Sequence, residues 1–444
     1  MTQEIIHELG NGLVLRRATA DDTESLAAFH ADVHRDPGVE EPEQYVAAWV
    51  RDLMSRPHPT FSPGDFTVVE DMQTGEIVSS LCLISQVWAY EGIEFGVGRP
   101  ELVGTRSDYR RRGLIRAQME VIHGWSAERG ERLQAITGIP YYYRQFGYEM
   151  TMSLGGGRGG FGSNVPKLKD GEAEPYRLRL AKAEDVPFVA QVYQEGASRW
   201  PVVCVRDEAL WRYELDGRSE MNVNRRDLCI VETVEGEPVG FVHRTPRIYR
   251  GRVGVGVYEL KPGVSWLDVT PSLMRHLWAQ GEAWAREEPD QNLETFGLWL
   301  GAEHPALALF EGRLPQMIRP YAWYLRVPDL PGFLRHIGPA LEQRLATSPL
   351  SGHTGELKLS FYRDGLRMQF EAGKLVEVGP WQPTHAEGGD AGFPGLTLLH
   401  LVFGYRTMQE LDEMLPDCWT ANDGVRELLH VLFPKRPSDV WPVS

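Results

Sequence analysis

The sequence predicts an α/β chain in which one fold occurs twice and a small α+β region follows. The first observation is a repeat, because residues 13–22 read LVLRRATADD and residues 176–185 read YRLRLAKAED. The second is a strand–loop–helix–strand pattern over residues 101–137, which is the crossover of an α/β unit. The third is an alternating, turn-rich stretch after residue 327, which is typical of a small antiparallel sheet. Three domains also suit the length of 444 residues at about 150 residues per domain.

Each copy of the repeat reads as a short apolar and basic strand, then an acidic pair, then an amphipathic helix. The acidic pair suits a helix N-terminus, where the helix dipole favours negative charge. A match this short also arises by chance. Residues 155–164 between the copies read GGGRGGFGSN and lack the lysine and following helix of a phosphate loop, so we expect a flexible connector. The expected domains are therefore 1–154, a glycine-rich linker 155–172, 173–327 and 328–444.

The third region predicts a sheet followed by helices. Leu357, Leu359 and Phe361 alternate, a turn follows at residues 364–365, and two further alternating runs cover residues 366–370 and 375–378. Helices are expected over residues 396–403, from Thr407 with Glu410 as a capping box, and around residues 425–432. This α+β region shows no catalytic constellation.

Composition excludes several classes of protein. The chain carries 46 Lys and Arg against 62 Asp and Glu, a net charge of −16, which disfavours a nucleic-acid partner. Such a charge suits amine ligands or simply favours solubility. Four distant cysteines without a CxxC pair disfavour disulfides and a metal site, and predict a cytoplasmic setting. Neither a secretory signal nor a membrane-spanning stretch is expected.

The stretch that carries chemistry is the helix start at Arg110–Arg112 and Gly113. Cations are disfavoured at a helix N-terminus, so three arginines there indicate a bound anion such as phosphate, although a solvated basic patch is the alternative. Gly104 within the preceding strand indicates a bulge or a close backbone contact. A strand splayed in this way leaves backbone groups that can pair with the amides of a pantetheine arm.

The sequence RRRGLI at residues 110–115 resembles the motif of the GNAT acyl-CoA N-acetyltransferases, Arg/Gln-x-x-Gly-x-Gly/Ala. Ile115 departs from the last position, as in the subgroup of the enhanced intracellular survival protein. Residues 141–148, YYYRQFGY, look like the tyrosine-containing end of that subgroup's acetyltransferase core. The resemblance implies tandem GNAT folds with mixed central sheets, followed by a small α+β domain similar to sterol carrier proteins.

The resemblance also implies site residues and acetyl-CoA as cosubstrate, with no metal. Pyrophosphate contacts carry over to Arg111, Arg112, Gly113, Leu114, Ile115 and Arg116. Pantetheine contacts carry over to Val103, Gly104, Thr105, Gly138 and Ile139. The general acid carries over to Tyr143, for which an aromatic cluster is the structural alternative and Tyr142 or Tyr141 the substitute. The general base carries over to the C-terminal carboxylate of Ser444, with His34 as another candidate.

The expected activity is transfer of acetyl to a primary amine of aminoglycoside, polyamine or lysine type by direct attack on the thioester. Carboxylates between residues 32 and 43 would attract such a cation, namely Asp32, Asp36, Glu40, Glu41 and Glu43. The second copy lacks an arginine–glycine loop before an expected helix at 271–285, so we expect it to be inactive and to wall the acceptor site. Alternatives are a non-catalytic CoA-binding scaffold and a hydrophobic-ligand carrier acting through the C-terminal domain. The resemblance implies a symmetric homo-oligomer such as a hexamer.

Overall fold

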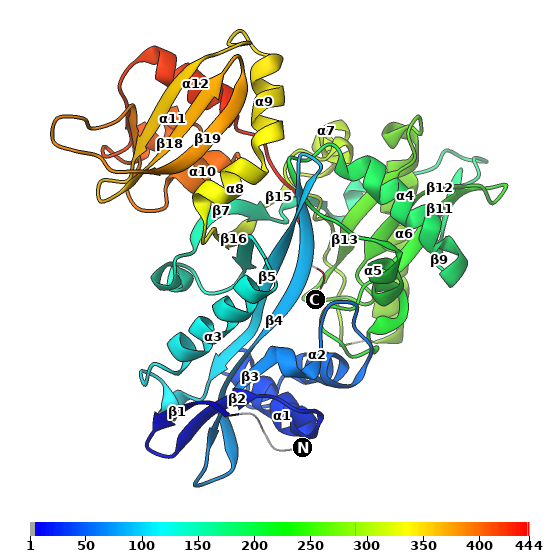
Figure 1. Cartoon of the computed structure of the whole chain (residues 1–444). Helices are drawn as coiled ribbons and strands as arrows, with labels where there is room; N and C mark the ends of the chain where they lie inside the picture. The colour runs from blue at the N-terminus through cyan, green and yellow to red at the C-terminus, as the bar shows by residue number, and fades with distance from the viewer. Residues whose placement is uncertain (1–4, 289, 442, 444) are drawn as a thin grey trace.

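The computed structural model describes residues 5–288, 290–441 and 443, and it contains three sheets with helices packed on them (Figure 1). The first sheet has the order β1-β2-β3-β4-β5-β6-β16-β7, and β10 also pairs with β4. Its strands are β1 (Ile5–Gly10), β2 (Leu13–Arg17), β3 (Phe66–Asp71), β4 (Glu76–Tyr90), β5 (Ile93–Thr105), β6 (Leu133–Ile136), β7 (Glu149–Leu154), β10 (Val202–Cys204) and β16 (Tyr321–Arg326). Its helices are α1 (Thr23–Val33), α2 (Gln44–Ser55) and α3 (Leu114–Glu128).

The second sheet repeats this plan with the order β15-β8-β14-β13-β12-β11-β9. Its strands are β8 (Gly157–Gly160), β9 (Tyr176–Leu180), β11 (Asp227–Thr233), β12 (Pro238–Arg244), β13 (Arg252–Leu260), β14 (Thr295–Leu298) and β15 (Gln316–Ile318). Its helices are α4 (Val186–Ala197), α5 (Glu208–Arg212), α6 (Trp266–Glu287) and α7 (Pro305–Leu309). Both sheets are mixed, because β5–β6 and β13–β14 are parallel pairs among antiparallel neighbours.

The repeated segment is the same structural element in both units. Arg16 on β2 bridges Asp22 and Glu70 at 2.7 Å each. Arg179 on β9 bridges Asp185 at 2.7 Å and Glu232 at 2.9 Å. In both copies the aspartate also accepts a hydrogen bond from the backbone three residues earlier. The predicted repeat is therefore confirmed, and the chain contains tandem copies of one fold.

The two units exchange strands. The chain leaves β7 in the first sheet and enters the second as β8, and it returns from β15 to the first sheet as β16. The prediction of a flexible glycine-rich connector is wrong over residues 157–160, because these residues form a largely buried strand. A Cβ atom at Gly157 would lie 2.0 Å from the Leu298 carbonyl oxygen, and one at Gly159 2.7 Å from that of Phe296. The glycines therefore permit close backbone packing rather than flexibility.

The third region packs on the far end of the β4–β5 hairpin. Its sheet has the order β19-β18-β17-β20-β21, made of β17 (Gly355–Ser360), β18 (Gly365–Glu371), β19 (Lys374–Trp381), β20 (Ala391–Gly392) and β21 (Trp419–Thr420). Its helices are α8 (Leu330–His336), α9 (Gly338–Ala346), α10 (Leu398–Val402), α11 (Met408–Met414) and α12 (Asp423–Leu432). The expected sheet, helices and Thr407–Glu410 capping box are confirmed. Tyr90 at the hairpin tip donates to the Val402 carbonyl at 2.7 Å, and one hydrophobic core spans both parts.

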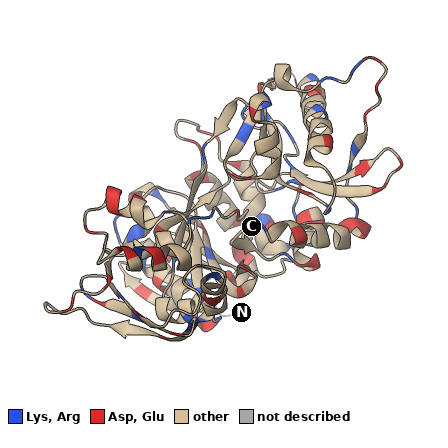
Figure 2. Ribbon diagram, turned by 90° about the horizontal axis from the view of Figure 1, so that it is seen from above, with Lys and Arg blue, Asp and Glu red and all other residues tan. Residues whose placement is uncertain are grey.

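Charge does not collect on one face of this structure. Figure 2 shows acidic and basic residues interspersed over all three regions. The net charge of −16 is therefore distributed, and it does not by itself mark a binding surface. Among the described residues, no helix combines the length and apolar character needed to cross a bilayer.

Candidate active site

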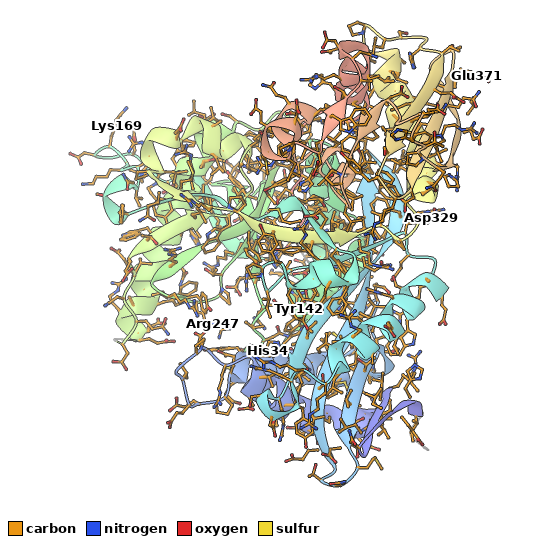
Figure 3. All side chains as sticks on the ribbon, turned by 90° about the vertical axis from the view of Figure 1, so that its left-hand side faces the viewer. His34, Tyr142, Lys169, Arg247, Asp329 and Glu371 are labelled. Atoms are coloured by element: carbon orange, nitrogen blue, oxygen red, sulfur yellow. The ribbon has the colours of Figure 1, made fainter. Side chains whose placement is uncertain are left out.

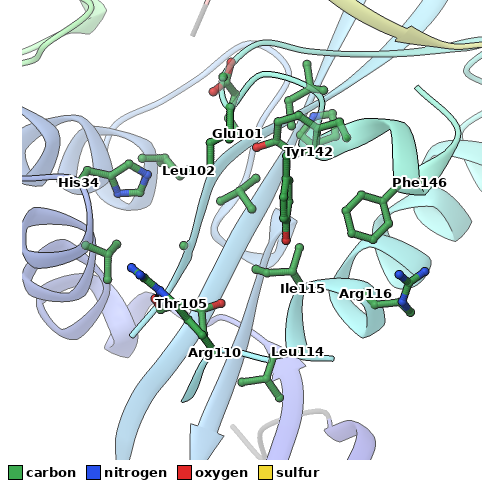
Figure 4. A pocket seen from close by; sticks show the side chains of 18 of the residues that line it. His34, Glu101, Leu102, Thr105, Arg110, Leu114, Ile115, Arg116, Tyr142 and Phe146 are labelled. Carbon is green, nitrogen blue, oxygen red and sulfur yellow. Dashed lines mark hydrogen bonds between the residues drawn. The ribbon is translucent and has the colours of Figure 1, made fainter. Parts of the chain in front are cut away.

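A pocket of about 850 Å³ lies where β5 and β6 diverge. The two strands pair only at Val97–Leu133 and Gly98–Gln134, and β5 then continues to Thr105 without β6 beside it. Figure 4 shows His34 and Leu102 on one wall, with Tyr142, Phe146 and Arg116 opposite. The remaining lining comes from α1, α2, β5, the loop before α3, and the segment after β6.

The start of α3 forms one end of the pocket and leaves hydrogen-bond donors free. Gly113 precedes the helix with φ = 78°, and its carbonyl accepts the first helical bond from Ala117. Three N–H groups of the first turn consequently have no acceptor within the helix, and no acidic side chain lies in that turn. Arg110, Arg111 and Arg116 also line this end. Free N–H groups, a positive helix end and arginines together can hold a pyrophosphate.

Strand β5 is distorted where it borders the pocket. Ser80 pairs with Gly104 while Cys82 pairs with Glu101, so β5 carries an extra residue, and Leu102 has φ = 52°. A Cβ atom at Gly104 would lie 2.7 Å from Val33 Cγ2. The glycine thus lets α1 pack directly on the strand. The predicted bulge and close contact are both present, and they turn backbone groups of β5 out of the ladder toward the pocket.

Tyr143 lies in a short 3₁₀ turn, Tyr142–Phe146, behind the end of β6. Its side chain is buried, with the ring edge against Gly138 and the Tyr142 ring 5.2 Å away. Burial, followed by the nearby Glu101 carboxylate, raises the pKa of Tyr143, which keeps its hydroxyl protonated at neutral pH. Within the described residues the hydroxyl makes no hydrogen bond, so it is available as a donor to a group in the pocket. The Tyr143 ring therefore packs in the aromatic cluster, while its hydroxyl is left without a hydrogen-bond partner among the described residues.

Glu101 is a pocket residue that the sequence reasoning missed. It follows the first buried stretch of β5 and pairs with Arg99, whose side chain is 1% exposed. Burial raises the pKa of Glu101, and the Arg99 guanidinium opposes that rise. The available signal was an arginine and a glutamate two residues apart, Arg99 and Glu101, in a strand rich in apolar residues, because charged side chains are seldom buried without a partner.

The C-terminal tail reaches this same part of β5. The Val443 carbonyl accepts hydrogen bonds from Arg99 Nη1 at 2.8 Å and from the Gln86 amide. Two earlier carbonyls of the tail are held as well, that of Val440 by the Trp323 indole at 3.0 Å and that of Trp441 by Arg206 at 2.7 Å. The predicted base, the carboxylate of Ser444, lies outside the described residues.

The structure brings most of the predicted site residues to this pocket. Those that line it are Val103, Gly104, Thr105, Arg111, Gly113, Leu114, Ile115, Arg116, Gly138, Ile139 and Tyr143, together with the alternatives Tyr142 and His34. Arg112 points elsewhere, since its Nη2 donates to the Asp108 carbonyl at 2.9 Å and its guanidinium stacks on Tyr109. Tyr141 is 73% exposed and outside the lining.

The acidic residues between 32 and 43 do not form the expected acidic cleft. Among the described residues that line the pocket, none of these five carboxylates appears. Asp36 pairs with Arg250 of the second unit at 2.6 Å, Asp32 lies 3.7 Å from Arg35, and Glu43 caps α2. The β12–β13 connection, which carries Arg250, faces the loop after α1 (Figure 3). Asp36 therefore points to the second unit and not into the pocket.

The second unit has a corresponding but filled cleft. β13 and β14 diverge after the pair Val255–Leu298, and the Trp441 ring packs against Gly256 beyond that point. A Cβ atom at Gly256 would lie 3.1 Å from this ring. Helix α6 begins at Trp266, five residues before the predicted start, with Pro271 inside the helix. Pro271 is the sixth residue of the helix, so the Leu267 carbonyl lacks the N–H partner that position 271 would otherwise supply. The absence of an arginine–glycine loop before α6 agrees with a cleft that serves packing.

Comparison with known proteins identifies a family match and several structures of similar fold. Residues 14–151 match the family of acetyltransferase (GNAT) domains. No curated protein matches the sequence. A conserved protein of unknown function from Enterococcus faecalis, described as a "probable N-acyltransferase", is 14% identical with a TM-score of 0.67 over 97% of this chain and 99% of that one. A GCN5-related N-acetyltransferase from Kribbella flavida is 17% identical with a TM-score of 0.62 over 96% and 97% of the two chains. Eis1 from Mycobacterium abscessus is 16% identical with a TM-score of 0.58 over 96% and 98%, and at these identities the likeness shows the fold.

Proposed function

Since residues 14–151 form a GNAT acetyltransferase domain, we propose that this acetyltransferase transfers acetyl from acetyl-CoA to a primary amine by direct attack on the thioester. One observation carries the proposal: a single pocket joins the uncapped start of α3, the bulged strand β5 and the free hydroxyl of Tyr143. The anion site and the backbone edge suit the binding of CoA, and the hydroxyl suits protonation of its leaving sulfur.

The pocket suits an extended acyl-CoA. The first-turn N–H groups of α3 and the side chains of Arg111 and Arg116 would take the pyrophosphate. The pantetheine arm would run between Val103–Thr105 of β5 and Gly138–Ile139 beyond β6, where the two strands have separated. Its amides would pair with backbone groups that the splay leaves without a partner strand.

The chemistry then needs a proton donor and a proton acceptor. The amine nitrogen forms a bond to the thioester carbon, the C–S bond breaks, and the CoA sulfur leaves as thiolate. The Tyr143 hydroxyl donates a proton to that sulfur, and its raised pKa ensures that it carries the proton. Backbone N–H groups at the bulge would stabilise the negative charge on the carbonyl oxygen.

For the proton that leaves the amine, we propose the C-terminal carboxylate of Ser444, with His34 as the alternative. The support is the anchoring of the preceding residue, because Arg99 and Gln86 hold the Val443 carbonyl beside β5. Arg99 also holds Glu101 in the pocket wall. Arg99 would thus position both the tail and the wall of the site.

The test is release of free thiol from acetyl-CoA with a panel of amines. Tyr143→Phe should lower kcat at least tenfold, about 1.4 kcal/mol of barrier, because the leaving thiolate loses its proton donor. Acetyl-CoA binding by titration calorimetry should stay near the wild-type value. Tyr141→Phe is the matched control: its hydroxyl is exposed, so kcat should stay within twofold. An undiminished rate for Tyr143→Phe would remove this residue from the mechanism, and saturable CoA binding without release for any amine would contradict the transfer itself.

A further inference from the structure

The end of the pocket away from α3 has apolar walls. Val33 at the end of α1, Val46 and Trp49 on α2, and Leu102 on β5 line it, together with the His34 imidazole. Trp49 and Leu102 are buried, at 8% and 4% exposure. If CoA occupies the α3 end as proposed, this apolar end receives the acceptor. The argument therefore rests on the proposed function.

Charge in this acceptor end is nearly absent. Among the described lining residues, Glu101 is the one carboxylate, and Arg99 already neutralises it. In the loop after α1, Asp36 pairs with Arg250 and Glu43 caps the start of α2, and among the described lining residues none comes from residues 35–45. Arg247 of the second unit further adds positive charge beside that loop, with its guanidinium 4.2 Å above the Tyr45 ring (Figure 3). A second or third ammonium group on an acceptor would lose its water here without gaining a partner.

His34 offers one hydrogen-bond acceptor at the same place. Its Nδ1 lies 3.1 Å from the His30 carbonyl oxygen, which can only accept, so Nδ1 carries the hydrogen and Nε2 keeps a lone pair. Burial lowers the pKa of His34, so the ring is neutral at pH 7 and does not repel an amine. A Cβ atom at Gly104 would lie 3.5 Å from His34 Cε1, so the ring sits against the bulged strand. Figure 4 shows the imidazole pointing from α1 into the pocket.

We propose that the acceptor is a monoamine whose single amino group is carried on an apolar hydrocarbon or aromatic body. His34 Nε2 accepts a hydrogen bond from the amino group, and Val46, Trp49 and Leu102 cover the body. Aminoglycosides and polyamines, which carry several ammonium groups, are poor acceptors at this site. The inference narrows the class of amine and leaves the transfer reaction as proposed above.

The experiment compares n-octylamine with 1,8-diaminooctane in the thiol-release assay, with 2-phenylethylamine, spermidine and kanamycin alongside. n-Octylamine and 1,8-diaminooctane have the same eight-carbon chain and differ by one ammonium group. Their comparison therefore measures the effect of the second positive charge. We expect kcat/KM for octylamine to exceed that for the diamine at least thirtyfold, and phenylethylamine to exceed spermidine and kanamycin. Equal or inverted preferences, with release still observed, would overturn the monoamine class and leave the transfer standing. Release with no amine at all would overturn both.

Two variants connect the preference to the named wall. Val46→Asp places a carboxylate in the first turn of α2, where the helix dipole tolerates it, and should shrink the octylamine-to-diamine ratio at least fivefold. Val39→Asp is the control, because Val39 is 44% exposed in the loop before α2 and outside the lining, and it should leave the ratio unchanged. His34→Ala should raise KM for octylamine several-fold while acetyl-CoA binding stays constant. An unchanged ratio in a folded Val46→Asp protein would contradict the assignment of this wall to the acceptor.

Discussion

The two places where a parallel strand pair diverges are built from equivalent elements, and they differ in what fills them. In the first unit the divergence of β5 and β6 leaves a pocket of about 850 Å³. In the second unit the divergence of β13 and β14 leaves about 20 Å³, because Trp441 and Asp439 of the C-terminal tail enter the gap. One copy of the fold thus keeps an open cleft, and the other uses its cleft to hold the C-terminal tail.

The helix that begins beside each cleft shows the same contrast. α6 satisfies its own N-terminus, since the Ser265 hydroxyl accepts from the Asp268 N–H at 3.3 Å and Asp268 adds a negative charge in the first turn. α3 has neither a side-chain cap nor an acidic residue in its first turn. Capping typically contributes about 1 kcal/mol, so an uncapped helix start is maintained at a cost. The anion that we propose to bind at α3 would offset this cost at the open cleft, whereas α6 at the filled cleft supplies its own cap.

The largest expected effect comes from emptying the filled cleft. Trp441→Ala removes the ring that packs over Gly256, which should lower the free energy of unfolding by about 2–4 kcal/mol through lost burial and a residual cavity. Activity should fall with it, because Trp441 lies two residues before the Val443 anchor on Arg99. Urea denaturation and the thiol-release rate measure the two effects. Trp441→Phe, which keeps an aromatic ring, should retain most of both.

Acetyl-CoA stoichiometry sharpens the comparison further. The emptied second cleft still faces a helix start that is self-capped and has no arginine in its first turn, so Trp441→Ala should bind one acetyl-CoA per chain, like the wild type. Binding of two acetyl-CoA molecules per chain would show that the tail alone, and not the helix start, prevents the second cleft from binding acetyl-CoA. If the free energy of unfolding of Trp441→Ala equalled that of the wild type, the Trp441 ring would not stabilise the fold.

Much of this comparison was available from the sequence. The 13–22 and 176–185 repeat, the arginine-rich start of α3 and the elements after residue 327 follow from periodicity, capping and charge, which act over a few residues. The Ser265-to-Asp268 spacing also matches a capping pattern and could have explained why the second unit lacks an anion site. Local patterns of this kind carry their meaning within one turn of helix or one strand.

The rest depends on contacts between distant segments. The glycines of residues 157–160 read as a flexible connector until the backbone of β14 is placed beside them. The carboxylates after α1 read as an acidic cleft until Arg250, more than 200 residues later, pairs with Asp36. Strand exchange between the units and the path of the tail likewise have no local signature, because both arise from tertiary packing.

A smaller effect should appear in the pH dependence of stability. Burial raises the pKa of Glu259 in the second cleft to about 7 from 4.5, although Arg199 lies 2.6 Å from both carboxylate oxygens and opposes the shift. A folded-state pKa above the unfolded value means that the contribution is complete below pH 4.5 and is lost as the pH rises through about 7. The free energy of unfolding should therefore fall by about 1–3 kcal/mol between pH 5 and pH 8 from this group.

Urea denaturation at several pH values measures this loss, and Glu259→Gln should flatten it. Glu237→Gln alters an exposed glutamate of the same unit, 69% exposed, and should keep the wild-type profile. An unchanged slope in Glu259→Gln would mean that the second cleft holds this carboxylate ionised through its pairing with Arg199.

The smallest expected effect separates two adjacent arginines at the open cleft. Arg111 lines the pocket at the start of α3, whereas Arg112 is turned onto Tyr109 and the Asp108 carbonyl. Arg111→Ala should therefore raise KM for acetyl-CoA about fivefold, which corresponds to a loss of about 1 kcal/mol of binding free energy. kcat should stay nearly constant, because Arg111 stabilises the bound substrate and the transition state equally. Arg112→Ala should change KM less than twofold. The difference should shrink with added salt, because exposed charge interactions are screened. Equal effects of the two substitutions would mean that general positive charge, rather than the side chain facing the pocket, attracts the cosubstrate.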